Sequence, residues 1–166
     1  HTTSLVFNDP PLHSRVRKIM TGAMNPKAVA LMEPGLEKLI DSLLNTMEDE
    51  TNLIEDFAMK IPVEVIGNLF NIPHSQRGPL RDWSLAILGA LEPSPTNIQL
   101  SKGNAAVLEF KDFLKDITDE RRINPGNPDT DVLTRMLEAE ESNLSETELL
   151  QNCIFILNAG HETTTN

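Results

Sequence analysis

The stretch LLQNCIFILNAGHETTTN, from Leu149 to Asn166, decides the fold class of this chain. Seven of its first nine residues are apolar, and the apolar run then meets Ala159, Gly160 and the polar residues 161–165. A buried strand is one interpretation, because the apolar part is rich in β-branched and aromatic residues. On that interpretation the polar part would be the strand-to-helix turn of a nucleotide-binding unit.

A helix is the better-supported interpretation of the same stretch. A parallel strand needs partner strands, and no other segment of the chain has the pattern of one. A phosphate-binding loop needs more glycines than Gly160 alone. Ser145 and Glu148 have the spacing of a capping box just before the apolar run. We therefore expect a helix from Ser145 onward, buried on most of its sides because it is apolar all round.

The polar end of this helix has two interpretations. Glu162 and the following threonines lie either in the interior, where a carboxylate is costly unless it is paired or used, or at the surface where the helix ends. The threonines also weaken the helix, because their hydroxyls can bond back to preceding carbonyls. A zinc site is not expected, because Thr165 stands where the HExxH motif needs its second histidine.

The rest of the chain has the periodicity of helices and almost no alternation of period two. Pro34 is expected to open a helix, and Pro62 to mark a first turn or a kink. The sequence therefore predicts an all-α fold. The expected helices cover residues 9–24 with Asp9 as N-cap, a short one from Pro26, then 34–47, 56–73, 75–91, 97–123 with Leu108 on its buried side, 131–141, and 145–166.

Composition excludes some classes of protein. The net charge of -11 among 166 residues argues against nucleic acid as a main partner. Cys153 is the only cysteine, so an internal disulfide is impossible. No apolar run reaches the ~18 residues that suggest a membrane span.

Three segments together resemble the cytochrome P450 monooxygenases. AGHETTT at residues 159–165 resembles the family's central-helix signature [AG]-G-x-[DE]-T-[TS]. DPPLHSRVRKIM at residues 9–20 resembles the DPPEHTRLRR helix near the haem, and FAMKIPVEVIGNLFNIP at residues 57–73 resembles a third family segment. The resemblance implies that residues 1–166 are a single partial domain of the mainly helical P450 fold, with an N-terminal region and a C-terminal haem-thiolate region outside this chain.

The resemblance also implies roles for single residues. Cys153 lies in an apolar helix without the family's ligand loop, so we expect it to be a core residue and the chain to contain no metal ligand. The implied catalytic residues are Glu162, which relays protons, and Thr163, which holds oxygen for protonation; the implied haem-binding residues are His13, Arg17, Ala159 and Gly160; and the implied substrate-pocket residues are Phe155 and Asn158.

The implied activity is insertion of one oxygen atom from O₂ into a small organic substrate by a haem-thiolate enzyme. The implied partners are separate electron-transfer proteins such as a ferredoxin and its reductase, and the implied location is cytoplasmic. The alternative is a non-catalytic, acidic helical interaction module. We expect the isolated 166-residue chain to form no thiolate-ligated haem and to be partly disordered.

Overall fold

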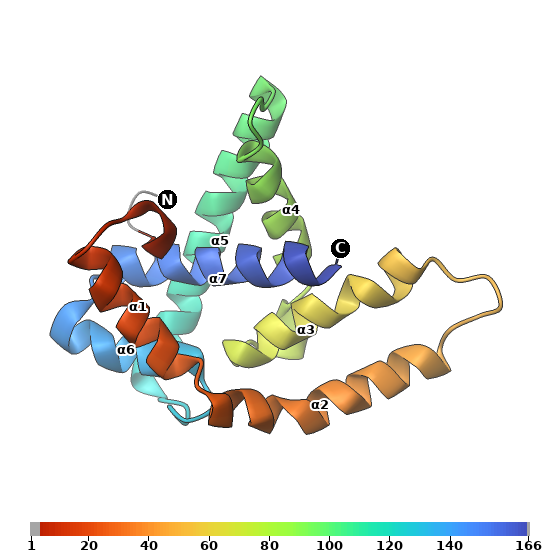
Figure 1. Cartoon of the computed structure of the whole chain (residues 1–166), viewed down its shortest axis with the longest axis horizontal. Helices are drawn as coiled ribbons and strands as arrows, with labels where there is room; N and C mark the ends of the chain where they lie inside the picture. Colours follow the sequence, from red (N-terminus) through yellow and green to blue (C-terminus); the bar gives the residue numbers. More distant parts are fainter. Residues whose placement is uncertain (1–3, 166) are drawn as a thin grey trace.

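The computed structural model describes the backbone of residues 4–165, and the side chains in that range except those of residues 23, 140–143, 162, 164 and 165. Every regular element in the described part is a helix, so the all-α prediction is confirmed. Figure 1 shows their arrangement around one central helix. The elements are η1 (Leu5–Phe7), α1 (Leu12–Ala23), α2 (Pro26–Asn45), the π-helical η2 (Leu53–Ala58), α3 (Lys60–Leu69), η3 (His74–Gln76), α4 (Leu80–Ala90), α5 (Asn97–Ile123), α6 (Val132–Asn143) and α7 (Glu146–Thr165).

The stretch that could have been a strand forms the central helix α7. Its first turn is held by the predicted capping box: the Ser145 N–H donates to Glu148 Oε2 over 2.7 Å, and the Glu148 N–H donates to Ser145 Oγ over 3.3 Å. The helix crosses the middle of the molecule and contacts α3, α4, α5 and α6 (Figure 1). Because each of these helices covers part of it, α7 buries apolar residues on several sides.

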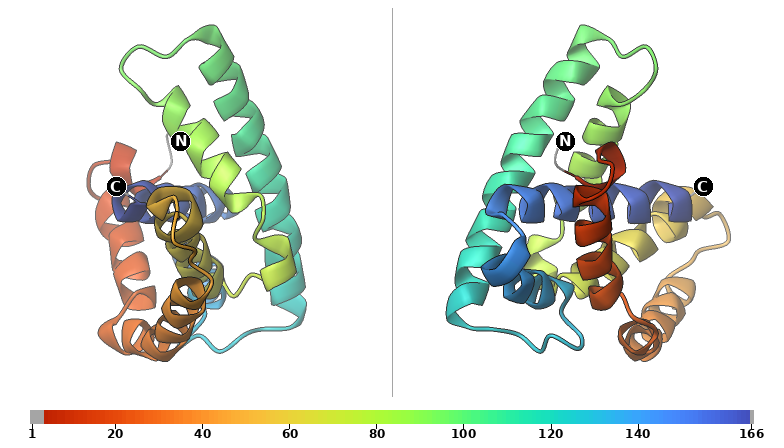
Figure 2. Two further views of the ribbon diagram at one scale, coloured as in Figure 1. Left: turned by 90° about the vertical axis from the view of Figure 1, so that its right-hand side faces the viewer. Right: turned by 60° about the vertical axis from the view of Figure 1, so that its left-hand side comes forward.

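A long hairpin of α4 and α5 projects from the body of the molecule (Figures 1 and 2). Trp83 stacks on Phe110 with ring centroids 5.2 Å apart, and Phe113 lies 5.3 Å from Trp83. Gly103 permits the close crossing of the two helices, because a Cβ at this position would collide with Ala90 and with the backbone of α4. The loop that joins the helices lies between Ala90 and Asn97, where the Pro-rich sequence predicts it.

Three local predictions are wrong. The helix expected to open at Pro34 begins at Pro26, where Asn25 Oδ1 accepts from the Ala28 N–H, and α2 then continues through the exposed Pro34. An exposed proline breaks one backbone bond but leaves the packing of the remaining turns intact. The first helix begins at Leu12 rather than after Asp9, whose backbone carbonyl, not its side chain, accepts from His13. Leu108, expected in the core, is 62% exposed because it lies on the outer face of α5.

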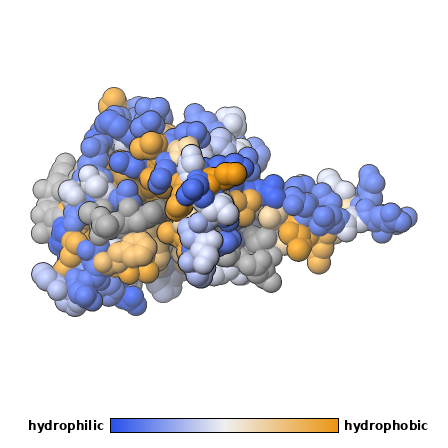
Figure 3. All heavy atoms as spheres, turned by 90° about the horizontal axis from the view of Figure 1, so that it is seen from above, coloured by the Kyte–Doolittle hydropathy of each residue, from blue (hydrophilic) through white to orange (hydrophobic). Residues whose placement is uncertain are grey.

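Apolar side chains are also exposed on the surface, where Figure 3 shows orange patches between hydrophilic ones. They lie mainly on α2, η2 and the α4–α5 hairpin. No helix in the described part of the chain is long and apolar enough to cross a membrane. The large exposed apolar residues on these elements are Val29, Leu31, Leu44, Leu53, Ile54, Leu85, Leu91, Ile98, Leu100, Leu108 and Ile123.

Candidate functional site

One stripe of α7 is not covered by the rest of the described chain. Phe155 is half-buried, whereas Ala159 and Thr163 are exposed. These three residues follow one another at intervals of four, so they lie on one face of the helix. All other residues from Leu149 to Asn158 are buried. We call Phe155, Ala159 and Thr163 the open stripe of α7; it contains three of the residues that the sequence predicts to act on substrate, haem or oxygen.

The hydroxyl of Thr163 bonds to its own helix. Thr163 Oγ1 donates to the carbonyl oxygen of Ala159 over 2.8 Å, which is the back-bonding expected of a threonine within a helix. Of the two interpretations of the polar end, the surface position holds for Thr163, which is exposed, although His161 in the same turn is buried. The side chain of Glu162 lies outside the described residues.

Gly160, next to the open stripe on α7, packs against α3. A Cβ at position 160 would be 2.7 Å from Cδ1 of the buried Ile66. Such a separation is too short for two carbon atoms, so the absence of a side chain at Gly160 lets α3 pack closely on α7. Gly160 and Ala159 therefore make this turn of α7 narrow on two sides.

Asn158 borders the open stripe and has an unusual environment. Its side chain is 8% exposed, and its Oδ1 has no hydrogen-bond partner among the described residues. Phe155, three residues earlier, is its neighbour on the helix surface. The two predicted pocket residues are therefore adjacent, and one of them presents a buried acceptor without a donor.

The predicted haem-binding residues on α1 lie apart from this group. His13 is half-buried and Arg17 is exposed, and they are one helical turn apart on α1. Neither has an ion-pair or hydrogen-bond partner through its side chain in the described part of the structure. Both side chains are therefore available to bind an anionic group.

The segment from η1 to α1 is fixed to the first half of α7. Arg15 Nη2 donates to Glu148 Oε1 over 2.5 Å, and the Leu5 N–H donates to Asn152 Oδ1 over 2.8 Å. The right-hand view of Figure 2 shows α1 running across α7. Burial opposes ionisation of Glu148, but the bonds from Ser145 and Arg15 together outweigh it and lower the pKa of this carboxyl. The charged carboxylate thus connects the start of α7 to α1.

Cys153 is a core residue. It is fully buried, and burial raises the pKa of its thiol to about 12. A thiol in this environment does not supply the thiolate that binds iron. Among the described residues, no group of three or more His, Cys, Asp or Glu side chains could hold a metal ion.

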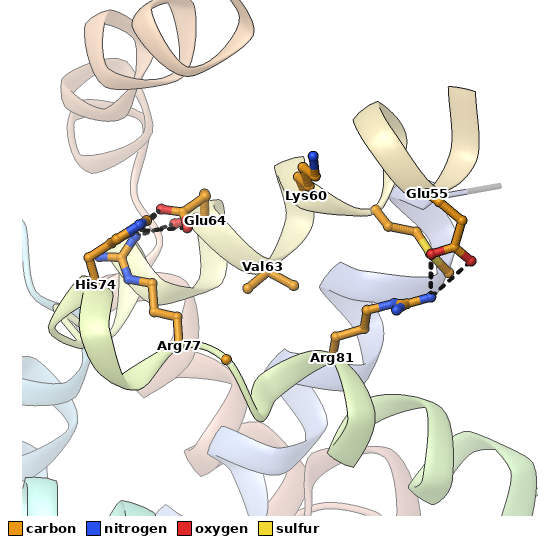
Figure 4. A pocket seen from close by; sticks show the side chains of 9 residues that line it. Glu55, Lys60, Val63, Glu64, His74, Arg77 and Arg81 are labelled. Carbon is orange, nitrogen blue, oxygen red and sulfur yellow. Dashed lines mark hydrogen bonds and ion pairs between the residues drawn. The ribbon is translucent and has the colours of Figure 1, made fainter. Parts of the chain in front are cut away.

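A separate pocket of about 390 Å³ lies between η2, α3 and the start of α4 (Figure 4). Arg77 donates to Glu64 Oε2 over 2.5 Å and to the Ile72 carbonyl over 2.8 Å, and Arg81 donates to Glu55 over 3.0 Å. Both arginines are therefore turned toward glutamates rather than toward a common ligand position. None of the predicted site residues lines this pocket, whose ion pairs connect α4 to η2 through Arg81 and the end of η3 to α3 through Arg77.

Sequence reasoning missed the residues that hold these elements in place. Arg15, Ile66 and Arg77 act through partners that are 133, 94 and 13 positions away in the sequence. Local periodicity identifies Ile66 as a core residue but does not identify Gly160 as its neighbour. The sequence contains no local signal for the pair Arg15–Glu148.

Comparison with known proteins identifies relatives for nearly the whole chain. No family model matches. The chain is 33% identical over 166 residues to cytochrome P450 107B1 of Saccharopolyspora erythraea, and 32% identical over 161 residues to cytochrome P450 CYP107DY1 of Priestia megaterium. These matches cover 98% and 94% of the chain but only 38% of each relative.

The fold agrees with a solved structure. The crystal structure of CYP164A2 from Mycobacterium smegmatis superposes with a TM-score of 0.89 and 32% identity, over 98% of this chain and 43% of that one. The agreement covers the helices that carry the motifs at residues 9–20 and 159–165. From sequence similarity over nearly its whole length and from this shared fold, the chain belongs to the cytochrome P450 family.

Proposed function

We propose that this chain is the part of a haem-thiolate monooxygenase that activates oxygen and binds the haem propionates. The observation that carries the proposal is the open stripe of α7, where Ala159 and Thr163 of the family signature are exposed directly after a stretch, Leu149 to Asn158, that is buried except for the half-buried Phe155. The alternative, a non-catalytic interaction module, gives no reason for a buried helix to expose these residues in particular.

The residues present fit a haem group. A flat macrocycle needs a surface without large side chains, and the open stripe has only Ala159 and Thr163 beyond Phe155. Its carboxylates need cations, and His13 and Arg17 on one face of α1 have no partner in the described structure. In such enzymes the thiolate-bound haem supplies the reduction and cleavage of O₂. The buried thiol of Cys153 does not provide that thiolate.

Two side chains of α7 would handle protons. Thr163 Oγ1 would leave its bond to the Ala159 carbonyl and donate instead to oxygen bound beside the helix. Glu162, the adjacent residue, would return a proton to this hydroxyl from the solvent side, as a general acid does. Hydroxyl and carboxylate would thus divide positioning and proton supply between them.

The remaining expectations belong to the same proposal. The substrate would be a small organic molecule lying against Phe155 and Asn158, with O₂ as the second substrate. Electrons would come from separate redox proteins such as a ferredoxin and its reductase. We also propose that the protein is cytoplasmic and that residues 1–166 belong to one domain.

The proposal is tested in the full-length protein by measuring product and hydrogen peroxide against reduced cofactor consumed. We expect Thr163→Ala to consume cofactor but to release most of the electrons as hydrogen peroxide, because the proton donor at the oxygen is lost. Thr163→Ser keeps the hydroxyl and serves as the control. A product yield in Thr163→Ala equal to that of the wild type would mean that this hydroxyl is only structural.

Glu162→Gln should have a different effect. Proton resupply should fail while the position of Thr163 is kept, so the whole turnover should slow by roughly 10²–10⁴-fold, the typical contribution of a general acid. Slow turnover with an unchanged ratio of product to peroxide is the expected pattern. Full activity in Glu162→Gln would exclude this carboxylate from the proton path.

A further inference from the structure

Two polar contacts from the first two turns of α7 hold the segment that carries His13 and Arg17. Glu148 Oε1 accepts from Arg15 Nη2 on α1 over 2.5 Å, and Asn152 Oδ1 accepts from the N–H of Leu5 in η1 over 2.8 Å. Glu148 and Asn152 are four residues apart, so they lie on one face of α7. The segment from η1 to α1 is therefore attached to α7 at two separate points.

The acceptors of both contacts are shielded from water and fixed in direction. Asn152 is 0% exposed, and its Nδ2 also donates to the Glu148 carbonyl over 2.7 Å, so the amide cannot turn without losing a bond. The side chain of Glu148 is 12% exposed, and its Oε2 accepts from Ser145, which leaves Oε1 for Arg15. A charged hydrogen bond shielded from water is stronger than an exposed one. The position of Arg15 relative to α7 is therefore well determined.

Arg15 lies across α1 from His13 and Arg17. The helix packs mainly against α6. The strip of α1 that faces the core consists of Leu12, Val16, Ile19 and Met20. At about 100° per residue, Arg15 lies beyond one edge of this strip, whereas His13 and Arg17 lie beyond the other. A rotation of α1 about its own axis would therefore break the ion pair with Glu148 and turn His13 and Arg17 at the same time.

We propose that Arg15 and Glu148 are positioning residues, whose ion pair sets the rotation of α1 and so orients His13 and Arg17 toward the haem propionates. The inference rests on the proposed function, because it takes His13 and Arg17 as the propionate donors. Arg15 and Glu148 do not bind the haem themselves and act only through these two donors. A hydrogen bond depends on direction as well as distance, so a rotated α1 weakens the bonds to the propionates without removing their donors.

The test is the rate of haem transfer from the full-length haem protein to an excess of apomyoglobin. Glu148→Gln should accelerate the transfer by about 3–10-fold, which is the effect of losing roughly one net hydrogen bond to the haem. Glutamine can still complete the capping box with Ser145, so this variant breaks only the ion pair with Arg15. Arg15→Gln breaks the same pair from α1 and should accelerate the transfer by a similar factor.

A background without the two donors separates positioning from a general loss of stability. In the double variant His13→Ala, Arg17→Ala, the further change Glu148→Gln should cause no additional acceleration, because no donor remains for the ion pair to orient. Glu64→Gln is the matched control. It breaks the ion pair of Glu64 with Arg77, which involves a similarly shielded carboxylate on α3 instead of α7. Any acceleration that Glu64→Gln causes should be the same in both backgrounds.

The outcomes separate this inference from the proposed function. Unchanged haem transfer in the double variant of His13 and Arg17 would contradict the propionate site itself, and the inference with it. If that variant transfers haem faster than the wild type, an equal acceleration by Glu148→Gln in both backgrounds would contradict only the positioning role. Unchanged transfer in both Glu148→Gln and Arg15→Gln would likewise overturn the positioning role and leave the propionate site intact.

Discussion

The first and last helices each carry side chains of opposite environment. On α7, Cys153 is fully buried with a raised pKa, while Thr163 is exposed and bonds to its own helix. On α1, Arg15 is paired with Glu148, while His13 and Arg17 have no partner in the described structure. On α1, His13 and Arg17 are four residues apart and share a face, whereas Arg15, two residues from each, faces another side. The helical spacing thus divides the residue that holds the fold from those that can bind a ligand.

The unpaired residues of α1 carry the first prediction at this scale. His13→Ala and Arg17→Ala should each weaken haem retention in the full-length protein, because each removes a donor to a propionate. Haem per protein would be measured after gel filtration. Lys18→Ala removes an exposed positive charge from the same helix without changing this face and should retain haem as the wild type does. A double variant of His13 and Arg17 that retains haem fully would contradict the assignment.

Glu148 carries the second prediction, on the pH dependence of stability. Its pKa is lowered in the folded protein, so its charged form stabilises the fold above the ordinary value of 4.5, and this contribution is lost as the pH falls through the folded value. At neutral pH, Glu148→Gln should lower the free energy of unfolding by about 1 kcal/mol, because the charged bond to Arg15 is lost.

The difference between Glu148→Gln and the wild type should shrink as the pH falls below 4.5, where the wild-type carboxylate also becomes neutral. Denaturant unfolding of the full-length protein at several pH values measures this difference. Glu146→Gln changes an exposed carboxylate in the same turn and should cost less than about 0.5 kcal/mol at any pH. A difference for Glu148→Gln that stays constant with pH would exclude the ion pair as its cause.

At the scale of the elements, the contact between α3 and α7 depends on Gly160. Gly160→Ala should lower the free energy of unfolding by about 1–3 kcal/mol, because the new Cβ would be 2.7 Å from Cδ1 of Ile66. Ile66→Val removes that atom, so the double variant should be more stable than Gly160→Ala alone. Gly35→Ala is the control: no atom lies within 4 Å of its added Cβ, and it should stabilise the helix α2 by about 0.5–1 kcal/mol. Additive effects of Gly160→Ala and Ile66→Val would contradict this contact.

The helices themselves were largely predictable, because caps and periodicity are local signals. The capping box of Ser145 and Glu148 predicts the start of α7 correctly, and it favours a helix over a strand for this stretch. The prediction that a helix begins at Pro34 is wrong, because a helix can continue through a proline where the packing of its other turns holds it. The pairs that assemble the site, Arg15 with Glu148 and Gly160 with Ile66, join residues far apart in sequence. Local pattern does not encode such contacts.

At the scale of the whole molecule, the other helices of the described chain cover the middle of α7 on every side except the open stripe. The arrangement agrees with the similarity to P450 relatives, which extends over nearly the whole chain. The chain covers only 38% of the length of each of these two relatives. We propose that the chain provides one face of a haem site and that the iron ligand is a residue other than Cys153. The account thus makes a spectroscopic prediction for the full-length protein.

The most direct test is the absorbance spectrum of the full-length protein after reduction with dithionite in the presence of carbon monoxide. We predict the long-wavelength Soret band of a thiolate-ligated ferrous carbonyl haem, with the same band in Cys153→Ser. Purified protein without haem, or a carbonyl spectrum of the type given by a nitrogen ligand, would contradict the account.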